Sequence, residues 1–251
     1  MMTVEFTLLT LNLRNILDRY EERKPLLAAE FARLEPNIAA IQEAAYLEER
    51  QDELLAAAAP GHTYRLFDAR SRRYPEFGNG LLIGLGNVEV SEELRLSNGR
   101  CALRTLVLLP GNLTMWVVTT HLHHRPDDAD ERLVQVNEIV RWLDAAPQAD
   151  GAIVCGDFNA PPAEPAYAGM TSAGYVSAHV SIHGVEPGVT WPSGIQAEGM
   201  ETGDPKCVDY IWLRGRLTAS SVDLAFNRPA KNDSTLYASD HYGLIARLVL
   251  G

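Results

Sequence analysis

Short hydrophobic runs, some alternating with polar residues and some continuous, dominate the chain and predict many strands. Residues 3–13 alternate early and then become apolar, which is typical of a strand that enters a core. Residues 38–41 form a shorter apolar run of the same kind. Further β-rich runs occupy residues 62–67, 80–86, 88–96, 101–109, 113–120, 151–155, 207–213, 217–226 and 242–250. Turn-forming pairs such as Gly86-Asn87 separate several of these predicted strands.

Three segments have the hydrophobic spacing of helices. Residues 25–34 begin with Pro25, a residue that favours the first position of a helix. Residues 46–59 form the second predicted helix, which ends before a Pro-Gly pair. Residues 127–146 give the clearest helical pattern, with one apolar face made of Leu133, Val136, Val140 and Leu143.

The remaining stretch, residues 161–202, is rich in Pro, Gly and Ser and predicts mostly loop with one short helix. No internal repeat, low-complexity tract or linker divides the chain. Many strands with a few interspersed helices predict a layered α/β fold and a single domain over residues 1–251. The composition, 46% hydrophobic and 22% charged, excludes a disordered chain, a collagen-like chain and a coiled coil.

The charge balance bears on the partners. The chain has 22 Lys and Arg against 33 Asp and Glu, a net charge of −11, so an extended clamp on duplex nucleic acid is not expected. Adhesion to an anionic membrane is disfavoured for the same reason. No apolar run approaches the roughly 20 residues of a membrane span, and no basic leader precedes the first apolar run. We therefore expect a soluble, cytoplasmic protein without a membrane partner, and nothing demands an obligate protein partner.

The cysteines give no sign of a structural cross-link or a zinc site. Cys101, Cys155 and Cys207 are odd in number, far apart in sequence, and form no CxxC pair. We expect three scattered, buried thiols.

Polar residues follow several of the apolar runs, where a buried strand would end. They are Asn12, Glu43, His121, Asp157, Asn159, Asp209, Asp240 and His241. A carboxylate at the end of a core strand costs desolvation energy unless a partner compensates it. Four converging carboxylates would repel one another, and a divalent cation would relieve that repulsion. The pattern therefore predicts a Mg²⁺-type site with hard oxygen ligands.

Each of these residues also has a plainer explanation when it is taken alone. A single Asp after a strand is more often a turn or helix cap, and a single His is more often a hydrogen-bonded surface residue. The segment 156–162, Gly-Asp-Phe-Asn-Ala-Pro-Pro, is different because its Gly, Asn and two Pro residues fix a rigid turn directly behind a buried strand. Such a turn holds Asp157 and Asn159 at defined positions, as catalysis requires.

Seven short motifs in order resemble the endonuclease/exonuclease/phosphatase superfamily, which includes deoxyribonuclease-I-like nucleases. They are residues 9–14 (LTLNLR), 36–43 (PNIAAIQE), 78–83 (GNGLLI), 119–122 (TTHL), 156–162 (GDFNAPP), 208–211 (VDYI) and 239–241 (SDH). The motifs span nearly the whole chain. The resemblance implies two stacked, mostly antiparallel β-sheets in a sandwich flanked by helices, with the site at one end.

The resemblance also implies the chemistry, which is hydrolysis of a phosphate ester with Mg²⁺ or Mn²⁺. Glu43 would be the principal metal ligand, with Asn12 and Asp240 in or next to the metal shell. Asp157 would orient or deprotonate the attacking water. His241 would contact the phosphate or transfer a proton, and which of the two is the base stays open.

The remaining members of the implied site have supporting roles. Asp209 would hold His241 in one tautomer. Asn159 and His121 would donate hydrogen bonds to the phosphoryl oxygens as charge builds on them.

Basic residues near these motifs are candidates for substrate binding. Arg14, two residues past Asn12, would share a strand face with it and reach either a substrate phosphate or a site carboxylate. Arg72 lies in a polar loop, where it would either bind a phosphate or carboxylate in a bidentate way or simply contact solvent. His124 would either line the site mouth or contact solvent in the turn before the next helix.

The most plausible substrate class is a phosphodiester, either a small one or a short or single-stranded nucleic acid. A phosphomonoesterase acting on a small metabolite is the first alternative. The second alternative is a non-catalytic binding module that keeps the fold.

Overall fold

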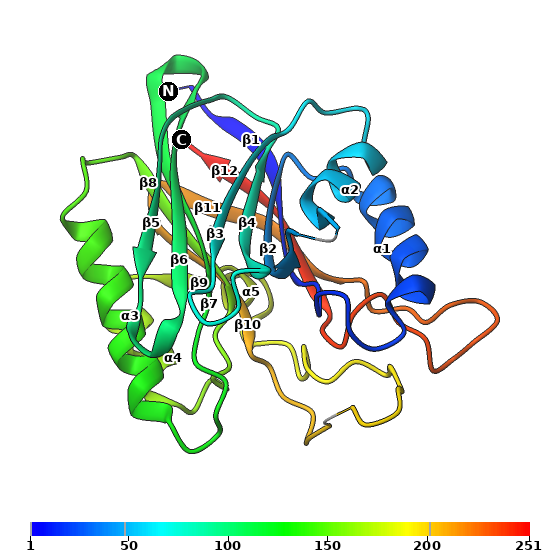
Figure 1. Cartoon of the computed structure of the whole chain (residues 1–251). Helices are drawn as coiled ribbons and strands as arrows, with labels where there is room; N and C mark the ends of the chain where they lie inside the picture. The colour runs from blue at the N-terminus through cyan, green and yellow to red at the C-terminus, as the bar shows by residue number, and fades with distance from the viewer. Residues whose placement is uncertain (1, 48, 201) are drawn as a thin grey trace.

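The structure, a computed structural model, describes residues 2–47, 49–200 and 202–251 and contains two stacked six-stranded sheets (Figure 1). The first sheet has the order β11-β12-β1-β2-β4-β3 and the second β5-β6-β7-β8-β10-β9. The first consists of β1 (Val4–Asn12), β2 (Ile38–Ala45), β3 (Arg65–Arg70), β4 (Phe77–Ile83), β11 (Leu217–Ala225) and β12 (Gly243–Leu250). The second consists of β5 (Asn87–Arg95), β6 (Cys101–Leu109), β7 (Leu113–His121), β8 (Gly151–Asp157), β9 (Val176–Ser177) and β10 (Asp209–Gly215).

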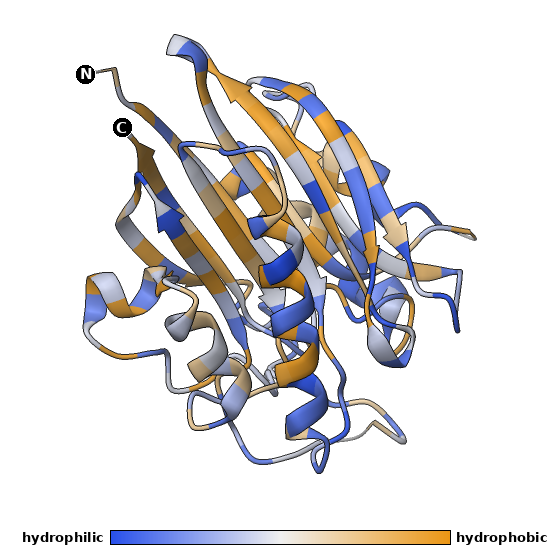
Figure 2. Cartoon of the chain, turned by 90° about the vertical axis from the view of Figure 1, so that its left-hand side faces the viewer, coloured by the Kyte–Doolittle hydropathy of each residue, from blue (hydrophilic) through white to orange (hydrophobic). Residues whose placement is uncertain are grey.

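The pairing confirms the expected sandwich of mostly antiparallel sheets. Each sheet contains one parallel pair, β1 with β2 and β7 with β8, and its other strand pairs are antiparallel. Hydrophobic residues alternate with polar ones along many strands (Figure 2). The inward faces of both sheets, including Leu8 and Val117, share one apolar core between the layers, where burial provides the main stabilisation.

Helices cover the outer face of each sheet (Figure 1). They are α1 (Tyr20–Leu34), α2 (Gln51–Ala58), α3 (Ala129–Asp144), α4 (Pro165–Ser172) and α5 (Ala178–His183). Helices α1 and α2 pack on the first sheet, and α3 and α4 pack on the second. Within the described ranges, no helix has the length and apolarity to cross a lipid bilayer.

The first predicted helix begins earlier than its hydrophobic pattern indicates. Helix α1 starts at Tyr20, so Pro25 lies inside the helix and not at its first position. The reason is that the buried face of α1 continues through Arg23 to Tyr20. Arginine is a charged residue, so the apolar spacing does not include it. Helix α2 begins later than predicted, at Gln51, because Tyr46 is buried beside the end of β2.

Two further predictions about the helices need correction. The buried face of α3 includes the polar residues Arg132 and Gln135, so it is rotated from the expected stripe, and Val140 is only partly buried. The segment 161–202 contains two short helices, α4 and α5, where one was expected. The three cysteines are free and buried.

The strand directions bring distant motifs to one end of the sandwich. Both parallel pairs end there, with Asn12 at the end of β1 and Asp157 at the end of β8. The register places His121 of β7 and Asp209 of β10 on either side of Asp157. The loop before β12 returns to the same end, where the side chains of Asn12 and Asp157 are hydrogen-bonded at 3.0 Å. Two parallel pairs that point the same way thus collect the polar strand ends.

Gly156 is expected to be essential for this arrangement. It has φ +134°, and a Cβ atom there would lie 2.1 Å from the Thr120 carbonyl oxygen on the neighbouring strand. We expect Gly156→Ala to lower the free energy of unfolding by about 3 kcal/mol, because the backbone strain and the clash both act on a buried strand. Gly174→Ala is the matched control, since Gly174 has φ +81° with open space around it. Urea denaturation should give about 1 kcal/mol for this control. Equal losses in both variants would exclude the clash as the cause.

Candidate active site

The polar strand ends meet in one cluster built from both sheets. The first sheet contributes Asn12 from β1 and Glu43 from β2, and the loop before β12 contributes Asp240 and His241. The second sheet contributes the ends of β7, β8 and β10, with His121, Asp157 and Asp209. Apart from Glu43 these residues are buried, with relative exposures of 7% or less. Seven residues separated by up to 229 positions along the chain are therefore held in one place by the core.

Glu43 lies within β2, in an irregular stretch between Ile41 and Ala44, and not after the strand as its pattern indicated. Its φ of +48° is unusual for a residue with a side chain. The side-chain amides of Asn12 and Asn15 donate to Oε1 at 3.3 Å and to Oε2 at 3.2 Å. The Asn15 amide N–H also donates to the Glu43 carbonyl at 2.9 Å. With 24% of its side chain exposed, the fixed carboxylate keeps free lone pairs toward solvent.

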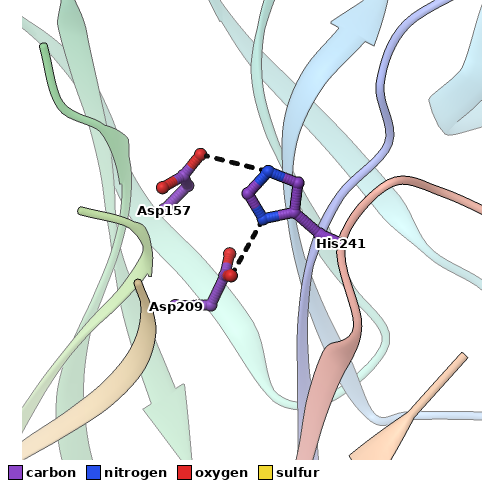
Figure 3. A group of neighbouring side chains, drawn as sticks. All are labelled: Asp157, Asp209 and His241. Atoms are coloured by element: carbon purple, nitrogen blue, oxygen red, sulfur yellow. Dashed lines mark hydrogen bonds and ion pairs between the residues drawn. The ribbon is translucent and has the colours of Figure 1, made fainter. Parts of the chain in front are cut away.

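A second group of side chains, Asp157, Asp209 and His241, forms a compact triangle in which each ring nitrogen of His241 faces one carboxylate (Figure 3). His241 Nδ1 lies 2.9 Å from Asp209 Oδ2, and His241 Nε2 lies 3.7 Å from Asp157 Oδ2. Asp209 Oδ1 is buried and has no protein partner in the part of the chain that is described. The imidazole is therefore held between two carboxylates, with Asp209 fixing its orientation.

The electrostatics of this group of three side chains favour a charged imidazole. Burial opposes the charge on His241, but Asp209, Asp157 and Asp240 outweigh that effect and raise its pKa to about 10. Burial raises the pKa of Asp157; the charge of His241 acts in the opposite direction, and Asp209 adds to the increase. Asp157 is thus shifted toward the pKa of a general base that works near neutral pH.

His121 joins the two groups. Its Nε2 is 3.4 Å from Asp157 Oδ2, and its Nδ1 is 3.9 Å from Glu43 Oε1. Burial, together with the charges of Arg100, His241 and His124, holds the pKa of His121 well below its ordinary value. His121 is therefore a neutral imidazole, which has one N–H to donate.

Two hydrogen bonds fix the Asp157 carboxylate, one from Asn159 in the same Gly-Asp-Phe-Asn segment and one from Asn12. The backbone N–H of Asn159 donates to Asp157 Oδ1 at 2.8 Å, and Asn12 Nδ2 donates to Oδ2. Asn159 has φ +50°, and its Nδ2 donates to the Leu122 carbonyl at 3.2 Å. One N–H and the amide oxygen of Asn159 remain for another partner.

Asp240 is brought to the edge of the cluster. Its Oδ1 lies 3.3 Å from Ser239 Oγ, whose hydrogen goes to the Asn12 carbonyl at 2.6 Å, and its Oδ2 accepts from Trp191 Nε1 at 3.3 Å. Arg14 Nη1 lies 3.7 Å from the same Oδ2. The expectation that Arg14 shares a strand face with Asn12 is wrong, because β1 ends at Asn12 and Arg14 turns away with φ +55°. It reaches the site from the loop, paired also with Asp18 at 2.7 Å.

The other two predicted substrate-binding residues differ in placement. His124 Nδ1 lies 2.9 Å from an Nη2 atom of Arg100, next to the His121 end of β7. Arg72 is exposed in the loop between β3 and β4, and no hydrogen bond or ion pair links it to the cluster among the described residues.

Three residues at the site were not selected from the sequence as site residues or were given less weight. Asn15 donates a hydrogen bond to the Glu43 carboxylate. In the sequence, the one feature that connects Asn15 with the site is that it directly follows the LTLNLR motif. Arg100 interacts electrostatically with Glu43 and Asp157 and has no carboxylate within 4.0 Å in the described ranges. Trp191, in the loop-rich segment 161–202, has its ring centroid 6.5 Å from that of His241. None of the three stands at the end of a hydrophobic run.

Two places in the cluster offer carboxylates to a cation. Ligand atoms of Asp157, Asp209 and His241 lie within 4.8 Å of one another. His241, however, is bonded to Asp209 and favours its protonated form, which repels a cation. The Glu43 carboxylate is oxygen-only, pre-oriented and partly open, so it fits a hard divalent ion better. Asn12 Oδ1 is used by the Arg14 amide at 2.9 Å, so Asn12 faces Glu43 with its amide hydrogens.

Comparison with known proteins places this arrangement in context. The model of the Endonuclease/Exonuclease/phosphatase family matches residues 9–241. Nocturnin from Xenopus laevis is 23% identical over 255 aligned positions, which cover 90% of this chain. The chain spans only 64% of the length of that relative.

Solved structures share the fold. The human Nocturnin catalytic domain with bound sulfate anion has a TM-score of 0.79 at 21% identity and covers 98% of this chain and 96% of its own. D. rerio TDP2 complexed with single strand DNA product has a TM-score of 0.78 at 18% identity, covering 97% and 98%. The two-sheet sandwich of this chain is therefore the fold of these proteins.

Proposed function

This chain belongs to the Endonuclease/Exonuclease/phosphatase family, and we propose that it is a divalent-metal-dependent phosphodiesterase that cleaves its substrate by attack of water. The observation that carries the proposal is the pre-oriented Glu43 carboxylate beside the buried group of Asp157, His241 and Asp209. The Glu43 carboxylate suits a hard cation, and the group of Asp157, His241 and Asp209 suits proton transfer and charge stabilisation.

The donor set around Glu43 fits Mg²⁺ or Mn²⁺. Its two oxygens are fixed by Asn12 and Asn15 and retain free lone pairs, and Asp240 lies at the edge of the same cluster. Glu43 would be the principal ligand, with Asn12 and Asp240 next to it. A bound ion would supply polarisation of a phosphoryl oxygen and stabilisation of the leaving oxygen.

The chain's own residues supply the remaining chemistry. Asp157, whose pKa is raised by burial, accepts a proton from the attacking water. His241, held as an imidazolium by Asp209, donates a hydrogen bond to a phosphoryl oxygen and offsets its developing charge. Neutral His121 and the free N–H of Asn159 donate to the same group of oxygens.

The substrate we favour is a phosphodiester, small or within a short single strand. The net charge of −11 disfavours a long duplex contact. The relative of known structure that carries a single strand DNA product supports a single-stranded substrate here. A phosphomonoesterase remains the alternative, since the same residues would serve a terminal phosphate.

The test is a hydrolysis panel with purified protein in Mg²⁺ or Mn²⁺, each with an EDTA control. The panel contains bis-p-nitrophenyl phosphate, p-nitrophenyl phosphate, single-stranded DNA, RNA and a DNA duplex. We expect metal-dependent turnover of the diester and of single strands. Faster turnover of the monoester would favour the phosphomonoesterase. Turnover that survives EDTA would refute metal dependence, and metal binding without turnover would indicate a binding module.

Arg100 gives a prediction about substrate affinity. Its guanidinium interacts electrostatically with Glu43 and Asp157, and no carboxylate among the described residues lies within 4.0 Å of it, so we expect it to bind a substrate phosphate beside His124. We expect Arg100→Ala to raise KM for single-stranded DNA about tenfold, about 1.4 kcal/mol, with kcat changed less than about twofold.

The control is Arg95→Ala in the neighbouring strand, where the arginine is mostly exposed and lies 4.0 Å from Glu93. In steady-state kinetics, KM of this control should equal that of wild type. Equal KM values for the two variants would mean that Arg100 does not contact substrate.

A further inference from the structure

Arg23 of α1 is a fully buried arginine whose hydrogen bonds to the described residues all go to main-chain carbonyls. Its guanidinium reaches the carbonyls of Leu13, Arg14, Asn15, Leu17, Asp18 and Ala238 at 2.6–3.3 Å. Five of these belong to the loop after β1, and the sixth belongs to the loop before β12. One side chain therefore binds the two loops that carry the site residues of the first sheet.

The absence of an acidic partner distinguishes Arg23 from the other buried arginines. Arg104 is paired with Glu92 at 2.5 Å, and Arg132 is paired with Glu164 at 2.7 Å. No carboxylate lies within 4.0 Å of the Arg23 guanidinium in the portion of the chain described here. The charges of Asp240 and Asp18 act on Arg23 only from beyond this distance. Burying a charge without a counter-charge in contact is a costly way to stabilise a fold, which points to a further role.

The loop that Arg23 holds has an unusual backbone. Arg14, Asn15, Asp18 and Arg19 all have positive φ angles, between 34° and 59°. Such conformations persist only where the surroundings over-determine them. The convergent carbonyls around the guanidinium provide this constraint, because the loop must curl to present all of them to one cation.

The curl places Asn15 against Glu43. Arg23 Nη2 and Gln51 Nε2 both donate to the Asn15 carbonyl, at 3.3 and 2.9 Å. The Asn15 side chain and amide N–H then donate to the carboxylate and the carbonyl of Glu43. Arg23 is thus one residue removed from the carboxylate that would bind the metal.

The second loop is held in the same way. Ala238 accepts from Arg23 Nη1 at 2.8 Å and directly precedes Ser239, Asp240 and His241. Ser239 Oγ donates to the Asn12 carbonyl at 2.6 Å. The two loops are therefore joined both at Arg23 and at the site.

We propose that Arg23 is a positioning residue that sets the metal affinity of the Glu43 site by fixing both loops through their carbonyls. The inference rests on the proposed function, because it assumes that Glu43 binds a divalent ion. A purely structural Arg23 would affect thermal stability and leave the affinity of the folded protein for metal unchanged.

The test compares Arg23→Lys with Arg104→Lys, which makes the same substitution at a buried arginine distant from the cluster. Lysine has three donors and cannot reach six carbonyls in two loops. We expect the Mn²⁺ Kd, measured by isothermal titration calorimetry on the folded protein without substrate, to rise roughly 10- to 100-fold in Arg23→Lys. It should stay within about twofold in Arg104→Lys. At saturating Mn²⁺, kcat of Arg23→Lys should recover to within about threefold of wild type.

An unchanged Kd in a folded Arg23→Lys variant would overturn the inference. A wild-type protein that binds no Mn²⁺ would overturn the proposed function, and this inference with it. The two failures are therefore distinguishable.

A measurement on the wild-type protein covers the case in which Arg23→Lys does not fold. If Arg23 raises metal affinity, linkage requires that metal in turn stabilises the Arg23 contacts. Arginine Nε–H signals followed by ¹⁵N NMR should show slower hydrogen exchange at Arg23 on addition of Mg²⁺, with Arg104 and Arg132 unchanged. Exchange at Arg23 that does not respond to bound Mg²⁺ would refute the coupling.

Discussion

Glu43→Gln is expected to lower kcat by roughly 10³-fold, about 4 kcal/mol of transition-state stabilisation, and to remove tight Mg²⁺ binding. Glutamine keeps the shape of the side chain but has one oxygen and no charge to offer a hard cation. Its amide nitrogen would also face the N–H donors of Asn12 or Asn15. Steady-state kinetics and calorimetric titration with Mg²⁺ would measure the two losses.

The same variant should remain folded. In EDTA its thermal midpoint should stay close to that of wild type, because the lost hydrogen bond and the removal of one charge from a site that also holds Asp157 act in opposite directions. Adding Mg²⁺ should raise the midpoint of wild type and not that of the variant. The matched control is Glu138→Gln, since Glu138 also accepts two hydrogen bonds, both from Ser97, but lies on α3. A control that loses as much activity as Glu43→Gln would contradict the assignment of Glu43.

The second large effect concerns His241. We expect His241→Ala to lower kcat roughly 10³-fold with a smaller change in KM, because the imidazolium acts on charge that develops in the transition state. The His241 imidazole lies 2.9 Å from Asp209 and 3.7 Å from Asp157. No other described imidazole lies between these two carboxylates. Single-turnover kinetics at saturating substrate would measure the loss in the chemical step.

Asp209→Asn tests the charge on that imidazole through pH. The raised pKa of about 10 keeps wild-type His241 protonated across neutral pH. Without the Asp209 carboxylate, less negative charge opposes the effect of burial, and the pKa of His241 falls. The active protonated form of His241 is then lost at a lower pH. We expect the alkaline limb of the kcat profile to move down by at least about one pH unit. Asp128→Asn, which changes the His–Asp pair formed with His123 at 2.8 Å outside the cluster, should not move it. A profile that is identical in Asp209→Asn and wild type would refute the proposed role of His241.

Much of this architecture can be predicted from the sequence, because strand patterns and motifs are local. The run at 101–109 is a strand as expected, and the order of the motifs indicated the family. The strand predicted at 151–155 is longer than expected, since β8 continues through Gly156 and Asp157. Local patterns fail where tertiary contacts decide. Glu43 lies in a bulge inside a longer strand, Arg14 leaves the face of β1, and α1 is lengthened by the buried Arg23.

The site residues missed from the sequence share a physical reason. Asn15 and Arg100 act through side-chain geometry that depends on how two loops fold back, and Arg23 acts through carbonyl groups that every residue possesses. A sequence records neither. The left-handed conformations are only hinted at by Asn15 and Asp18, residue types that tolerate positive φ.

The division of the cluster between the two sheets has a consequence for how activity arises during folding. Glu43 and His241 belong to one sheet and its loops, while Asp157 and Asp209 belong to the other. A chain in which one layer had formed alone would hold isolated acidic side chains and no working fragment of the catalyst. Catalytic competence is thus an all-or-none property of docking between the layers. An intermediate with complete secondary structure but loosened layers would be inert toward substrate.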